Sequence, residues 1–205
     1  MRRKRARASS MKKIFFTVIL LCFALIITAC GQEDQQNQQA QSSQGHQGAI
    51  TRVIPMQPDG PPVQGNLAPD FTLTDLEGRT WTLSALKGQV VFINFWATWC
   101  PPCISEMPSM QNLYDTLPKD QFKMLAVLYS DEADNAKDFS EKLDITLPIL
   151  VDKGNRTGMQ YGLTGVPETF ILDKQGVIRE THKGPAEWDS AEVIHMLRGY
   201  IDQDI

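Results

Sequence analysis

Apolar residues beyond position 66 fall into seven short runs that predict β-strands. Three of the runs are almost continuously apolar, which is typical of strands covered on both faces of a sheet. They lie at residues 90–95, 122–129 and 148–151. The other four are shorter and are joined in pairs by turn residues, which predicts two hairpins. They lie at residues 71–73, 81–83, 169–172 and 177–180.

Helices are predicted between these strands, at residues 102–117, 133–143, 155–161 and 187–201. The first has an apolar stripe at three- and four-residue spacing, formed by Met107, Met110, Leu113 and Leu117. Ser130 or Asp131 is the expected N-cap of the second. The order of elements predicts an α/β domain at residues 67–205: a mixed central sheet covered by helices and extended at its N-terminal end by a β-hairpin.

The N-terminal residues follow a different pattern, which predicts a targeting segment. Lys12 and Lys13 precede an apolar run at residues 14–27, long enough for a signal-peptide core and short for a membrane-spanning helix. The run leads to Thr28-Ala29-Cys30, which resembles the lipobox of bacterial lipoproteins. We expect residues 1–29 to be a signal peptide, with residues 1–10 a misassigned start, and Cys30 to carry lipid. The alternative is an uncleaved anchor at residues 14–29.

Residues 30–66 are predicted to be a disordered tether between the anchor and the domain. Glutamine dominates residues 32–47, and no apolar period is present. Such a segment buries too little surface to offset the entropy of ordering it. Prolines then become frequent at residues 55–62. A lipid anchor and an uncleaved anchor both place the domain outside the cytoplasmic membrane.

The N-terminal targeting segment and the rest of the chain also differ in charge. The 205 residues carry 20 basic and 24 acidic side chains, a formal charge of −4. Seven of the basic residues and none of the acidic ones lie within residues 1–29, which leaves 13 basic and 24 acidic residues and a charge of −11. Affinity for nucleic acid comes from neutralising phosphates, so an acidic domain is not expected to bind it.

The cysteines indicate reactivity rather than a disulfide-stapled scaffold. Cys22 and Cys30 lie in the targeting segment, which leaves Cys100 and Cys103 as a single C-x-x-C pair in the domain. The pair falls where a strand meets a helix, and the free N–H groups and partial positive charge of a helix N-terminus favour a thiolate at Cys100. We expect Cys100 to attack a substrate disulfide and the more buried Cys103 to resolve the mixed disulfide.

Two other uses of the pair fit the sequence less well. A structural Cys100–Cys103 bond would close too small a loop to stabilise the fold much. A zinc site usually needs four ligands, and the three histidines are not spaced as a motif. These are His46, His182 and His195. Neither a metal nor another cofactor is therefore expected.

The residues around the pair resemble a known family. Residues 94–103 read Asn-Phe-Trp-Ala-Thr-Trp-Cys-Pro-Pro-Cys and are followed by Glu106-Met107-Pro108, which looks like the TlpA/ResA-like branch of the thioredoxin superfamily. Residues 165–170, Gly-Val-Pro-Glu-Thr-Phe, are similar to its cytochrome c maturation members. Residues 68–71, Ala-Pro-Asp-Phe, match the start of this family and of peroxiredoxins. The resemblance covers about residues 66–200 and implies a thioredoxin-like fold and a protein thiol–disulfide oxidoreductase.

The resemblance also implies roles for residues outside the pair. Pro167 would be a cis proline facing the cysteines, with the backbone of Val166 free to pair with substrate; the alternative is an ordinary strand-entry proline. Glu106 would exchange a proton with Cys103, because the acid of thioredoxins is replaced here by Asn94; the alternative is a solvated helix glutamate. Glu168 and Trp99 are further candidates for substrate contact, although Trp99 can instead pack around the site, as Trp96 can.

The predicted function is reduction of protein disulfides outside the cytoplasm, for example those of apocytochrome c, with electrons from a membrane-embedded thiol donor. One alternative is a thiol peroxidase, but peroxiredoxins resemble Pro-x-x-x-Thr-x-x-Cys, whereas Thr98 lies two residues before Cys100 and no proline matches. Another is a metal-delivery module, but those of this superfamily tend to have C-x-x-x-C with a distant histidine.

The order of the two sulfur reactions is testable by single substitutions. Cys100→Ser is expected to abolish disulfide exchange because it removes the attacking sulfur. Cys103→Ser is expected to trap mixed disulfides with substrate, because nothing resolves them. Mass spectrometry after reaction with a disulfide substrate distinguishes the two variants, and equal activity in both would contradict these roles.

Overall fold

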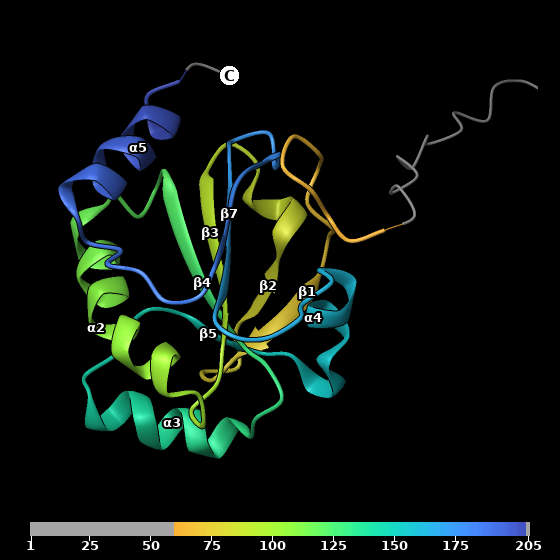
Figure 1. Cartoon of the computed structure of the whole chain (residues 1–205), viewed down its shortest axis with the longest axis vertical. Helices are drawn as coiled ribbons and strands as arrows, with labels where there is room; N and C mark the ends of the chain where they lie inside the picture. The colour runs from red at the N-terminus through yellow and green to blue at the C-terminus, as the bar shows by residue number, and fades with distance from the viewer. Residues whose placement is uncertain (1–59, 204–205) are drawn as a thin grey trace, which may run out of the picture. The chain divides into compact units, whose positions relative to one another are not determined.

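The seven predicted strands form one sheet in the order β2-β1-β5-β4-β3-β6-β7. The computed structural model describes residues 60–203, and Figure 1 shows their arrangement. The strands are β1 Thr72–Asp75, β2 Thr80–Thr82, β3 Val90–Trp96, β4 Phe122–Leu128, β5 Ile149–Val151, β6 Glu168–Leu172 and β7 Ile178–Lys183. The predicted signal peptide, Cys30 and the tether up to residue 59 lie outside the described residues.

The sheet is mixed, as predicted. Strands β3, β4 and β5 run parallel, whereas β1, β2, β6 and β7 each pair antiparallel with their neighbours. The β1–β2 hairpin adds to the β5 edge, and β6–β7 adds to the β3 edge. The thioredoxin-like fold and its N-terminal hairpin extension are therefore both present.

Helices cover both faces of this sheet. They are α2 Pro101–Thr116, α3 Ala133–Lys142, α4 Arg156–Gln160 and α5 Ala191–Ile201, with two 3-10 turns at Leu83–Leu86 (η1) and Lys153–Asn155 (η2). The chain moves in one direction across the sheet from β3 to β4 to β5, so right-handed crossovers place α2 and α3 on the same face. Figure 1 shows α5 on that face as well, and α4 on the other.

Side chains that alternate along β3 contribute to a hydrophobic core on each face of the sheet. Phe92 and Trp96 pack in the cluster beneath α2 and α5, whereas Ile93 and Phe95 pack in the cluster on the opposite face, which includes Tyr161. Burying a side chain of this size contributes about 1.5–3 kcal/mol. All four residues of the predicted α2 stripe are buried, which confirms the predicted face of that helix.

Most element boundaries lie within a residue or two of the predicted ones, and three of the differences have a local explanation. Helix α5 was expected from residue 187 but begins at Ala191, because the Ser190 hydroxyl accepts a hydrogen bond from the Val193 N–H and caps the helix there. Leu83, predicted to lie in a strand, opens the turn η1. Strand β7 continues to Lys183, and its polar last residues give no apolar signal.

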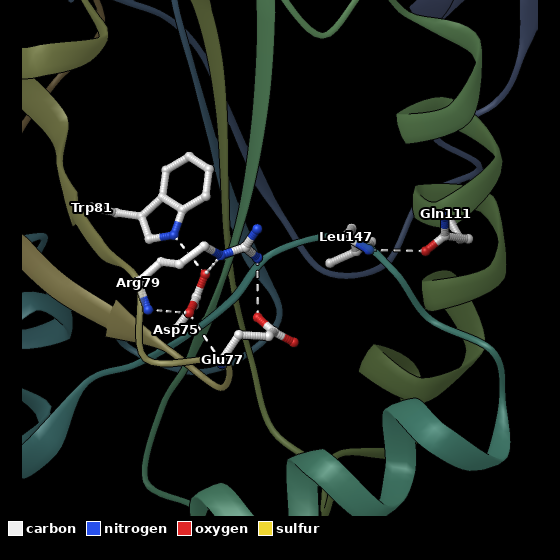
Figure 2. Close-up of polar contacts among 6 residues, drawn as sticks. All are labelled: Asp75, Glu77, Arg79, Trp81, Gln111 and Leu147. Carbon is white, nitrogen blue, oxygen red and sulfur yellow. Dashed lines mark hydrogen bonds and ion pairs between the residues drawn. The ribbon is translucent and has the colours of Figure 1, made fainter.

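A buried carboxylate closes the β1–β2 hairpin (Figure 2). One oxygen of Asp75 accepts from the backbone N–H groups of Glu77 (3.1 Å) and Arg79 (2.8 Å). The other accepts from the Arg79 guanidinium (2.7 Å) and the Trp81 indole (2.8 Å). Burial raises the pKa of Asp75, but the donors and the Arg79 charge outweigh it, so the pKa lies below its usual value.

Asp75→Asn is expected to lower the free energy of unfolding by about 1–3 kcal/mol, because donors are left unsatisfied and the Arg79 guanidinium loses one of its two carboxylate partners. The lowered pKa means that the Asp75 contribution is present above the unfolded pKa of about 3.9 and is lost as the pH falls through the folded value. Urea unfolding at neutral and acid pH checks both, since the difference between wild type and variant should shrink in acid. Glu77→Gln, an exposed acid of the same turn, is the control, and an equal loss there would contradict the role of Asp75.

Candidate active site

Strand β3 and helix α2 meet at the two cysteines. Cys100 is the N-cap of α2, and its Sγ accepts a hydrogen bond from the backbone N–H of Cys103 at 3.3 Å. A disulfide joins the two residues, whose Cα atoms are 5.3 Å apart. Both are buried, at 3 % exposed for Cys100 and 0 % for Cys103. The sulfur of Cys100 thus lies at a helix N-terminus, where a thiolate is favoured.

The loop before β6 lies against this disulfide. The Val166–Pro167 peptide bond is cis, and the carbonyl oxygen of Val166 is 3.5 Å from the Sγ of Cys100. In the disulfide this sulfur has no proton to donate, but a reduced Cys100 thiol at the same place could donate to that carbonyl. Pro167 is buried beside it. The resemblance had implied both the cis bond and its position facing the cysteines.

Glu106 is buried on α2 and is not the solvated glutamate of the alternative interpretation. Its Oε1 accepts from the Asn94 side-chain amide at 2.9 Å. Its Oε2 accepts from the Trp188 indole at 2.8 Å and from the backbone N–H of Ala186 at 3.2 Å. Burial raises the pKa of Glu106; the three donors and the charge of His182 oppose that rise without cancelling it.

A row of polar residues crosses three strands beneath α2. Asn94 of β3 is opposite Thr169 of β6, which is opposite His182 of β7. The Asn94 amide donates to the Thr169 hydroxyl at 2.9 Å as well as to Glu106. Its own oxygen is buried and has no hydrogen-bond partner among residues 60–203. The even positions of β3 face α2, which explains why Asn94 reaches Glu106.

The loop between β3 and α2 is fastened to the loop after β4. The backbone N–H and the hydroxyl of Thr98 both donate to one Asp131 oxygen, at 2.7 and 2.6 Å. Burial raises the pKa of Asp131, but hydrogen bonds from Asn135, Thr98 and the Glu132 backbone lower it by more, so the pKa lies below its usual value. Ser130 or Asp131 was expected to cap α3, but Glu132 occupies the cap position, and Asp131 instead binds Thr98.

The two tryptophans near the cysteines differ in environment. Trp96 is fully buried and packs against Phe139, with 5.2 Å between ring centroids. Trp99 is 57 % exposed, and its indole N–H donates to the Ser130 carbonyl at 2.9 Å. Trp96 is therefore a packing residue, whereas Trp99 presents an aromatic face to solvent beside Cys100.

Glu168 follows Pro167 and is buried at the first position of β6. The ammonium of Lys183, on β7, is 3.5 Å from its carboxylate and is itself largely exposed. Burial raises the pKa of Glu168, and Lys183 partly opposes that rise. The pair places one buried acid and one exposed cation at the same end of the sheet as the disulfide.

Sequence reasoning missed Trp188, Thr169 and Asp131 as parts of this site. Trp188 lies in the loop after β7, where no motif marks it. Thr169 was assigned to a strand, but its contact with Asn94 depends on strand register, which the sequence does not display. The described part of the chain holds no group of three His, Cys, Asp or Glu side chains arranged for a metal ion. Within residues 60–203 no helix is long and apolar enough to cross a membrane.

Comparison with known proteins agrees with this geometry. Residues 64–181 match the AhpC/TSA family. Over 120 residues the chain is 41 % identical to the thiol-disulfide oxidoreductase ResA of Geobacillus thermodenitrificans strain NG80-2, covering 58 % of this chain and 69 % of that protein.

Two solved structures share the fold. A thiol:disulfide interchange protein of the thioredoxin family from Chlorobium tepidum TLS matches with a TM-score of 0.57 and 26 % identity, over 68 % of this chain and 98 % of that one. An exposed lipoprotein thioredoxin from Streptococcus pneumoniae strain TIGR4 matches with a TM-score of 0.56 and 31 % identity, over 64 % and 99 %. The chain therefore belongs to the AhpC/TSA family and, within it, to the ResA-like thiol–disulfide oxidoreductases with a thioredoxin-like fold.

Proposed function

We propose that this enzyme reduces disulfides of client proteins outside the cytoplasm while tethered to the membrane, and that apocytochrome c is among its clients. The observation that carries the proposal is the Cys100–Cys103 pair at the N-terminus of α2, with the buried acid Glu106 three residues further along the helix. A strand-like segment of the client can approach the cysteines where the carbonyl of Val166 already contacts Cys100.

Reduction proceeds in two exchanges. The Cys100 thiolate attacks a client disulfide, forms a bond to one client sulfur and releases the other as a thiolate, which takes up a proton. Cys103 then gives its proton to the Glu106 carboxylate and attacks the Cys100 sulfur. The client leaves as a dithiol with two more electrons, and the enzyme keeps the Cys100–Cys103 disulfide. A membrane-embedded dithiol donor returns the enzyme to its reduced form by the reverse exchange.

The residues around the pair support client binding. The backbone of Val166, next to Pro167, is available for pairing with an extended client segment, the mode of strand addition. The exposed ring of Trp99 offers apolar contact, and its indole hydrogen bond to Ser130 fixes its orientation. Glu168, buried beside Pro167 with the Lys183 ammonium 3.5 Å from its carboxylate, is the remaining candidate for client contact.

Membrane attachment fits the same reaction. The lipobox-like sequence ending at Cys30 supports a lipid anchor, and the exposed lipoprotein from Streptococcus pneumoniae is a relative named as a lipoprotein. An anchor and a tether hold the domain near a membrane-embedded donor and near clients emerging from the membrane, which raises their effective concentration.

The direction of electron flow follows from the reduction potential of the Cys100–Cys103 pair. For a reductant we expect a value near that of thioredoxin, about −270 mV. The full chain is equilibrated in detergent with defined dithiothreitol buffers, and the fraction of free thiols at each buffer potential gives the reduction potential. A value near −120 mV, that of a strong oxidant, would contradict reduction and leave the site assignment intact.

The anchor is tested separately in a bacterium that processes lipoproteins. Cys30→Ser is expected to prevent incorporation of labelled fatty acid and processing of the N-terminal segment. Cys22→Ser is the matched control, because residue 22 lies upstream of the expected cleavage and its loss should change neither. Wild type that stays with the membrane without label would instead support an uncleaved anchor.

A further inference from the structure

Trp188 is held in one orientation beneath the active-site helix. Its indole is 3 % exposed and packs edge-on against Phe92 of β3, with ring centroids 4.8 Å apart, and against His182 of β7 at 5.3 Å. Its backbone N–H donates to the Ser109 hydroxyl of α2 at 3.1 Å. These contacts direct the indole N–H toward Glu106, whose Oε2 is 2.8 Å away.

The groups around Glu106 determine how much this hydrogen bond can change the proton affinity of its carboxylate. The donors from β3 and from the loop after β7, the Asn94 amide and the Ala186 N–H, are neutral. His182 on β7 is the titratable group outside α2 whose charge acts on Glu106, and Cys103 is the titratable group one turn earlier on α2 itself. Because burial opposes the carboxylate form, its proton affinity depends on how many N–H groups it keeps.

We propose that Trp188 is a positioning residue for the thiol–disulfide reaction: its indole N–H fixes the Glu106 carboxylate and thereby sets the pH at which Glu106 can take the proton of Cys103. The inference rests on the proposed role of Glu106 and adds to it the residue that controls that acid. Among residues 60–203 the hydrogen bonds of Trp188 go to Glu106 and Ser109 and not to either sulfur, so Trp188 acts through Glu106. The indole, on a loop outside the C-x-x-C motif, makes the acid's proton affinity adjustable without changing the cysteines.

The test measures the resolving step alone, over a range of pH. The reduced full chain in detergent is mixed with oxidised glutathione, which forms a Cys100–glutathione disulfide and releases one glutathione. Cys103 then displaces the second glutathione, and acid quenching with mass spectrometry follows the decay of the mixed disulfide. Trp188→Phe removes the indole N–H and keeps an aromatic ring. Loss of one donor to the carboxylate favours its protonated form, so the midpoint of the rate profile should rise by about one pH unit, a tenfold change in proton affinity.

Two other tryptophans provide matched controls. Trp81→Phe removes an indole N–H that also lies 2.8 Å from a buried carboxylate, but that of Asp75 in the hairpin. Trp96→Phe removes a buried indole N–H that has no hydrogen-bond partner among residues 60–203. Both should leave the midpoint unchanged. The Trp188→Phe shift should also persist in a His182→Phe background, which removes the histidine and keeps a ring against Trp188.

Glu106→Gln separates the inference from the function on which it rests. The inference is supported if Glu106→Gln slows decay of the mixed disulfide and removes the pH dependence of its rate. Adding Trp188→Phe to Glu106→Gln should then cause no further change in the rate profile. If Glu106→Gln changes the profile and Trp188→Phe does not, the inference is overturned and the role of Glu106 stands. If Glu106→Gln leaves the profile as in wild type, both are overturned. Should Trp188→Phe fail to fold, benzothienylalanine at position 188 replaces the N–H by sulfur at nearly constant shape and answers the same question.

Discussion

Burial of strand β3 on both faces is the constraint on which the rest of this structure depends. All seven of its residues are buried, with neighbours on both sides and helices above and below. The strand therefore cannot slip by one residue without exchanging its two cores. This register directs Asn94 toward α2 and leaves the strand end at Trp96, four residues before Cys100. The fixed end of β3 therefore determines where the cysteines lie.

Two buried carboxylates in this domain each accept a hydrogen bond from an indole N–H, yet their pKa values shift in opposite directions. Asp75 and Glu106 each accept an indole N–H at 2.8 Å. Burial raises the pKa of Asp75, but the Trp81 indole, the Arg79 backbone N–H and the Arg79 guanidinium together outweigh burial and lower it. The pKa of Glu106 is raised because its direct donors are neutral and burial dominates. The first carboxylate stays charged and stabilises a turn, whereas the second keeps a raised proton affinity, as the proposed exchange with Cys103 requires.

Much of the fold followed from the sequence because it depends on local patterns. The apolar runs predicted the strands, and the stripe from Met107 to Leu117 predicted the buried face of α2. The cysteines were found from spacing and from the helix N-terminus. What the sequence did not reveal depends on register and on loops. Trp188 reaches Glu106 across 82 positions, from a residue that the sequence assigned to the last helix but that lies in the loop before it. Thr98 reaches Asp131 across 33 positions, between two loops.

The presence of asparagine at position 94 is tied to the acid at position 106. The Asn94 amide nitrogen lies 2.9 Å from a Glu106 oxygen, so a carboxylate at position 94 would put two acids within hydrogen-bonding distance in a buried site. Like charges at that distance cannot both ionise, and the two would share a proton. With asparagine, the strand donates a hydrogen bond instead of competing for the proton. A single acid then titrates, and it lies on the same helix as Cys103, the resolving cysteine of the proposed reaction.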